Sequence, residues 1–61
     1  MNKSNVRQIQ ILAQMHKLGM ADNVALGLSA LIRAALRKSE RAELLEYADI
    51  FGVRNHPDFI I

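Results

Sequence analysis

The stretch VALGLSALIRAAL, residues 24–36, decides the fold, because apolar or small side chains occupy nearly every position in it. On a helix, at about 100° per residue, the polar side chains Ser29 and Arg33, with Arg37 just beyond, recur every fourth residue on one narrow strip. A helix that is apolar on its other sides is stable only when it is covered. The chain has only 61 residues with which to cover it. This mismatch predicts a partner, and we expect a homodimer.

The composition fits one small domain over residues 1–61. A chain of this size buries only about 60% of the surface that its unfolded form exposes. It has no cysteine, and its two histidines, His16 and His56, are far apart in the sequence. We therefore expect no disulfide and no metal site, and oligomerisation remains as the usual aid to stability. Because aromatic residues make up only 5% of the chain, the core must consist of aliphatic side chains, which suit helix packing.

Charge and hydropathy limit the expected surroundings of the protein. The net charge of +2 permits contact with nucleic acid without arguing for it. The apolar run at 24–36 is shorter than the roughly 20 residues that a membrane span needs. No secretion signal follows Lys3, and the lack of cysteine fits a cytoplasmic protein. We expect a cytoplasmic location and no membrane partner.

The pattern of side chains predicts three helices, at about residues 5–18, 23–38 and 40–51, followed by an extended tail at 53–61. Gly19 and Gly52 stand where a left-handed residue closes a helix. Ser39 is a good N-cap for the third helix. The fold class is therefore all-α: a helical hairpin plus a short third helix, packed as a homo-oligomeric bundle, most simply a dimer.

Two arrangements remain open for residues 23–51. In one unbroken helix, the apolar stripe containing Leu44 and Phe51 would fall about 140° from the stripe containing Val24 and Leu28, at about 100° per residue. A break near Lys38–Ser39 removes this difference in phase. The sequence favours the break, and the alternative is one long bent helix that feeds a dimer.

The second helix is the expected dimer interface. Small side chains on one side of it would let another backbone approach closely, and larger apolar side chains flank them. The predicted interface residues are Val24, Gly27, Leu28, Ala30, Leu31, Ala34 and Ala35.

Two polar strips are candidates for contact with a partner or with nucleic acid. One contains Arg33, Arg37 and Arg41, whose guanidinium groups can grip phosphates or carboxylates with two hydrogen bonds each. The other has helical spacing and contains Arg7, Gln10, Gln14 and Lys17. Both strips are equally typical of the solvated face of an amphipathic helix.

No pattern in the sequence predicts catalysis. His16 has no cysteine or histidine at helical spacing, and His56 and Asp58 flank Pro57 without a nucleophile nearby. No glycine-rich phosphate loop is present, and a bundle this small has little room for a dry cleft. We expect no enzyme activity, catalytic residue, cofactor, metal or small-molecule substrate.

Two segments carry partial resemblances to DNA-binding families. Residues 27–36 resemble the second helix of ribbon-helix-helix repressors, and that resemblance implies a paired strand over 7–11 with Gln8 and Gln10 facing the DNA. Gly19 departs from the pattern, because it interrupts the residues that would form the first helix. Residues 48–53 look like the first half of a helix-turn-helix, but Pro57 leaves no room for a recognition helix.

The sequence therefore supports two hypotheses of function. The first is a small non-enzymatic regulatory or adaptor protein that binds another macromolecule, more readily a protein than nucleic acid, through a homodimeric helical bundle. The second is a dimeric DNA-binding transcriptional repressor related to the ribbon-helix-helix family. The salt dependence of binding to DNA separates them.

Overall fold

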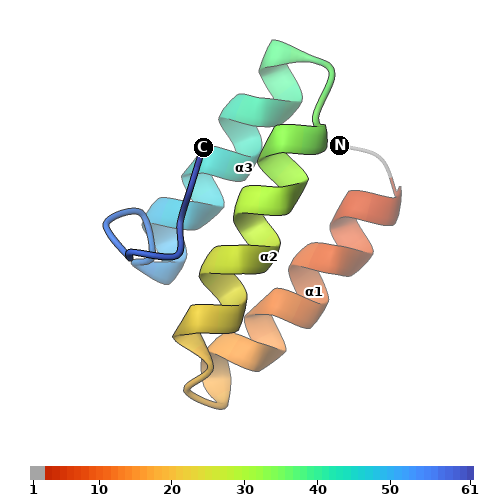
Figure 1. Ribbon diagram of the computed structural model, residues 1–61. Coiled ribbons are helices and arrows are strands. Elements are labelled where there is room, and N and C mark those ends of the chain that lie inside the picture. Colours follow the sequence, from red (N-terminus) through yellow and green to blue (C-terminus); the bar gives the residue numbers. More distant parts are fainter. Residues whose placement is uncertain (1–2) are drawn as a thin grey trace.

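The computed structural model describes residues 3–61, which form three α-helices and no strand (Figure 1). They are α1 (Lys3–Lys17), α2 (Ala21–Ala34) and α3 (Lys38–Phe51). The expected all-α fold is confirmed. Helix α2 packs along both neighbours, whereas α1 and α3 touch each other little. No helix within residues 3–61 is long and apolar enough to cross a lipid bilayer.

Helix α1 ends at the predicted glycine. Gly19 has a φ of 78°, and its N–H donates to the carbonyl of His16 while the Met20 N–H donates to that of Met15. This pair of bonds is a Schellman motif, which turns the chain back sharply. The turn is tighter than expected, so α2 begins at Ala21, two residues early, and runs antiparallel to α1.

Helices α2 and α3 are separate, with the break at residues 35–37 rather than at Lys38–Ser39. Ala35 has an extended backbone, with a ψ of 126°. The guanidinium of Arg41 donates to the Ala35 carbonyl at 3.0 Å and so satisfies an acceptor that the end of α2 leaves free. Ser39 is not an N-cap as expected, because α3 begins one residue before it and Arg37 occupies the cap position.

The core lies where α2 meets α1 and α3. It is mainly aliphatic, as the composition predicts, and Tyr47, Phe51 and Phe59 pack at its edge. The buried hydrophobic residues are Ile9, Leu12, Val24, Ala25, Leu28, Ile32, Ala35, Leu44, Ala48 and Val53. Gly27 sits at the seam between α1 and α2, where a Cβ atom would come within 2.8 Å of Leu12 Cδ2.

The C-terminal segment folds into successive turns and is not extended as predicted. Gly52, with a φ of 70°, ends α3 in a second Schellman motif, and Val53 packs back into the core. The His56 N–H then bonds to the Val53 carbonyl, and the Phe59 N–H bonds to the His56 carbonyl. Pro57 stands second in this last turn, where its fixed φ suits the geometry. The segment returns along α2 (Figure 1).

This return corrects the expected environment of Ser29. Its side chain is only 1% exposed, not on a wet strip. The hydroxyl donates to the Ala25 carbonyl at 2.8 Å and accepts from the Ile60 N–H at 2.9 Å. Ser29 therefore fastens the end of the chain to α2.

The chain's own fold also covers part of the predicted dimer interface. Val24, Leu28 and Ala35 are buried in the protomer, so a second copy cannot reach them in this structure. Of the remaining predicted interface residues, Gly27 faces Leu12 and Leu31 is half-buried. Ala30 and Ala34 are exposed. One side of α2 is thus buried within the protomer, and the other side is exposed.

Candidate binding surfaces

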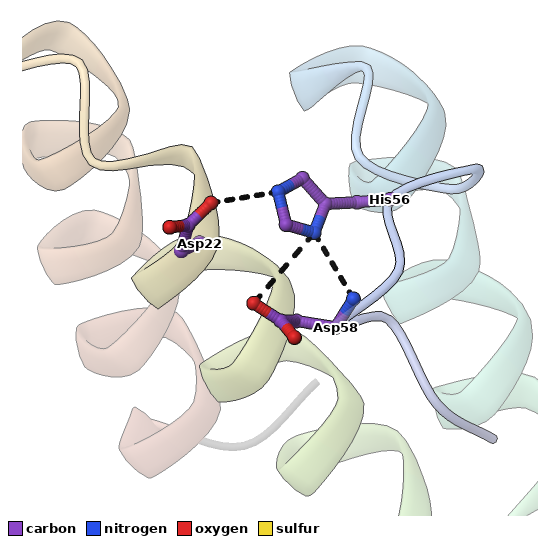
Figure 2. A group of neighbouring side chains, drawn as sticks. All are labelled: Asp22, His56 and Asp58. Atoms are coloured by element: carbon purple, nitrogen blue, oxygen red, sulfur yellow. Dashed lines mark hydrogen bonds and ion pairs between the residues drawn. The ribbon is translucent and has the colours of Figure 1, made fainter.

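Three side chains from two distant parts of the sequence meet where the C-terminal segment crosses the first turn of α2. Figure 2 shows Asp22 of α2 facing one ring nitrogen of His56 while Asp58 faces the other. His56 Nε2 lies 2.8 Å from Asp22 Oδ1. His56 Nδ1 accepts the Asp58 N–H at 3.1 Å and lies 3.9 Å from Asp58 Oδ2. Because Nδ1 accepts, Nε2 carries the proton that is donated to Asp22.

This cluster, the clasp, holds the C-terminal segment against α2. One ligand atom from each of its residues lies within 4.8 Å of the others. The two carboxylates nevertheless approach opposite nitrogens of the ring, so an ion bound at either nitrogen would have one carboxylate across the imidazole from it. The geometry is that of a hydrogen-bonded cross-link between two segments.

The clasp makes a testable contribution to the order of the C-terminal segment. Asp22→Ala should cost about 1 kcal/mol or less, because the Asp22 side chain is 76% exposed. It should also speed amide hydrogen exchange at Ile60, whose N–H bonds to Ser29. Asp22→Asn keeps an acceptor for Nε2–H and serves as the control. Exchange at Ile60 in Asp22→Ala that is as slow as in the natural chain would show that the clasp contributes nothing.

A second surface, the basic end, forms where three helix ends meet. The N-termini of α1 and α3 and the C-terminus of α2 lie together, as the hydrogen bond from Asn5 to Glu40 shows. Six of the chain's eight lysines and arginines are exposed there: Lys3, Arg7, Arg33, Arg37, Lys38 and Arg41. Within residues 3–61, only the side chains of Glu40 and Glu43 oppose them at this end, so the local balance is six positive against two negative side chains.

The expected arginine strip is rearranged by the break between α2 and α3. Arg33 belongs to α2, Arg37 to the connector and Arg41 to α3, so the three do not line one helix face. One N–H group of the Arg41 guanidinium also donates a hydrogen bond to the Ala35 carbonyl. The three arginines instead form part of a cluster around one end of the bundle. Their spacing in the sequence could not predict this cluster, because it assumes one continuous helix.

The basic end encloses a surface cavity of about 610 Å³. Apolar side chains of the α2 end and the connector line part of it, namely Leu31, Ala34 and Leu36. Asn5, Arg37, Glu40 and Glu43 add polar groups to its wall. Leu36 is 95% exposed, so an apolar side chain stands free among cations. Sequence reasoning missed this cavity, because it depends on where the break falls.

The other predicted contact strip lies on the outside of α1. Arg7, Gln10, Gln14 and Lys17 are all exposed, and only Arg7 belongs to the basic end. The strip therefore runs away from the cavity along a solvated helix face.

The structure contradicts the features that both DNA-binding resemblances require. Residues 7–11, the implied strand, lie within α1, so Gln8 and Gln10 belong to a helix. After Gly52, the described chain makes turns and forms no recognition helix. The period of the polar residues in α1 is the signal that distinguishes a helix from a ribbon here.

Comparison of this chain with protein-family models, with curated proteins and with solved structures finds no match.

Proposed function

We propose that this chain is a small non-enzymatic regulatory or adaptor protein that binds an acidic segment of another protein at its basic end. The observation that carries the proposal is the group of six exposed cations at the end of the bundle that also holds a partly apolar cavity. Arg37 lines that cavity together with Glu40 and Glu43, and the other five cations lie outside its wall. Guanidinium groups pair with carboxylates through two parallel hydrogen bonds. An apolar side chain of the partner would fill the space beside Leu31 and Leu36.

The same surface suits a protein segment better than a nucleic-acid backbone. Duplex DNA carries about one negative charge per 1.7 Å, and such a dense row would meet Glu40 and Glu43 as well as the cations. A peptide can place neutral groups beside these carboxylates. The aromatic rings Tyr47, Phe51 and Phe59 pack against the core and not at the basic end, so bases would find no stacking partner there.

The test is fluorescence anisotropy with a labelled peptide of glutamates around a single leucine. Removing two exposed guanidinium groups in Arg33→Ala/Arg37→Ala should weaken binding about tenfold, at up to roughly 1 kcal/mol for each pair. The matched control is Lys17→Ala/Arg54→Ala, which removes the same charge from the other end. An equal loss of peptide affinity in both variants would show that binding depends on net charge alone and not on the position of the arginines.

Two further probes test the class of partner. The same protein is titrated with duplex DNA and with phosphatidylglycerol vesicles at two salt concentrations. The proposal expects the peptide to bind more tightly than either. Tighter binding of DNA with a steep salt dependence would overturn it in favour of a DNA-binding protein.

A further inference from the structure

A third surface lies on the side of the α1–α2 hairpin that faces away from the core. We call it the outer face and define it by five residues: Ile11 and Met15 of α1, Leu18 directly after α1, and Leu26 and Ala30 of α2. Their spacing places the members of each helix in one row. Met15 is half-buried and also packs against the core, so it lies at the inner edge of this face. Leu18 is 68% exposed, Leu26 is 50% exposed and Ile11 is 41% exposed. The outer face is one part of the apolar surface that the chain leaves exposed, which also includes Leu36 and Ile50 elsewhere on the molecule.

The position of the outer face follows from the burial pattern. Ile9 and Leu12 of α1, and Leu28 and Ile32 of α2, are buried in the core. The contact of Gly27 with Leu12 fixes the seam between the two helices. Residues about half a turn from these on both helices then lie side by side on the far surface.

None of the five members of the outer face is charged. Helical spacing places the exposed neutral residues Gln8, Gln14, Asn23 and Ala34 beside them. The same spacing places three exposed charged residues, Arg7, Asp22 and Arg33, at the border of the face. Small residues at 30 and 34 let another helix approach closely. The uncharged members of the face suit another apolar face, and they impose no like-charge repulsion when the face meets its own copy.

The two ends of the protomer carry opposite charge. The basic end has six positive and two negative side chains. The other end has two positive ones, Lys17 and Arg54, against four negative ones: Asp22, Glu46, Asp49 and Asp58. The ion pairs of Arg54 with Asp49 and of His56 with Asp22 lie at this acidic end. Two copies that pack head to tail therefore place unlike ends together, whereas parallel packing places like ends together.

We propose that a second copy of this chain covers the outer face, with the two α1–α2 hairpins antiparallel about a two-fold axis. The four helices then form a bundle of ordinary geometry, with one α3 on each outer side. This dimer differs from the one that the sequence predicts, because Val24, Leu28 and Ala35 stay inside each protomer. None of the five residues of the outer face lines the cavity at the basic end, so the dimer does not depend on the acidic partner proposed above.

The size of the outer face sets the expected affinity. Helices of 14 and 15 residues are about 20 Å long, so the face is about 20 Å long and two helices wide. This area is at the low end for stable interfaces. We therefore expect a dissociation constant in the micromolar range, and the measurement should span about 1 μM to 1 mM.

The first experiment is sedimentation velocity over that range. The natural chain should pass from monomer to dimer, and Leu26→Glu should remain monomeric because it buries an unpaired charge in the interface. Ile50→Glu is the matched control, since Ile50 of α3 is 71% exposed and lies off the outer face. Both variants should keep the helical circular dichroism of the natural chain. A dimer that tolerates Leu26→Glu, or a natural chain that is monomeric at 1 mM, would overturn the proposal.

The second experiment tests the orientation with a single cysteine, which the natural chain lacks. In the antiparallel dimer, the two copies of residue 18 lie at opposite ends of the interface. Leu18→Cys should therefore form no disulfide-linked dimer under oxidation, since a disulfide needs Cα atoms within about 7 Å. Rapid cross-linking would indicate parallel packing and contradict the charge argument. A monomeric chain that still binds the acidic peptide would reject the dimer and leave the proposed function intact.

Discussion

Leu28→Ala should unfold a large fraction of the protein. Leu28 is fully buried in α2, at the centre of the core. Truncating a buried leucine to alanine costs about 2–5 kcal/mol, because apolar contacts are lost and a cavity remains. A domain of this length has only about 3–9 kcal/mol of stability, at roughly 0.05–0.15 kcal/mol per residue.

Urea titration followed by circular dichroism measures this effect. The control is Leu36→Ala, which removes the same atoms from a side chain that is 95% exposed. Its midpoint should stay within the error of the natural chain. A Leu28→Ala protein as stable as Leu36→Ala would mean that the core is not where the structure places it.

Gly27→Leu should destabilise the α1–α2 hairpin by about 1–3 kcal/mol, despite the better helix propensity of leucine. Even a Cβ atom at this position would come within 2.8 Å of Leu12 Cδ2, and Leu12 is itself buried. The added side chain must push the two helices apart or force Leu12 from its rotamer.

A double substitution tests the same contact from both sides. Leu12→Ala alone should cost about 2–5 kcal/mol through the cavity that it leaves. Combined with Gly27→Leu, it restores the lost volume at the seam, so the double variant should be more stable than Leu12→Ala alone. Simple additivity of the two costs in a thermal or urea titration would show that the residues do not meet.

The sequence predicted the structural elements that short-range signals determine. The apolar period of residues 40–51 and the glycines at 19 and 52 are short-range signals, and the helices and left-handed caps stand near the expected places. The observed helix boundaries differ from the predicted ones where the residue at the cap position is not the one with the highest capping propensity. Ser39 could cap a helix, yet α3 starts one residue before it, with Arg37 at the cap position and the Arg41 N–H bonded to the Arg37 carbonyl.

The features that the sequence could not reveal depend on contacts between distant residues. Ser29 has the polarity of a surface residue, but Ile60 comes from 31 positions away to bond it. Asp22 and His56 meet across 34 positions in the same way. The periodicity of one helix shows that an apolar side must be covered. It cannot show which segment covers it.

The same distinction between local signals and long-range contacts explains how the outer face was found. The sequence places excess apolar surface on the second helix, and the structure divides that surface in two. The side with Val24 and Leu28 is covered by α1, α3 and the C-terminal segment, whereas the side with Leu26 and Ala30 stays bare. The case for association with a second copy therefore rests on the bare side alone.

The most direct test of this account is an isotope-filtered nuclear Overhauser experiment on a mixture of labelled and unlabelled chains. The account predicts cross-peaks between copies from the methyl groups of Leu26 and Ala30 to those of Ile11 and Leu18. Cross-peaks between copies from Val24 or Leu28, or none from the outer face at concentrations where the mass is that of a dimer, would contradict it.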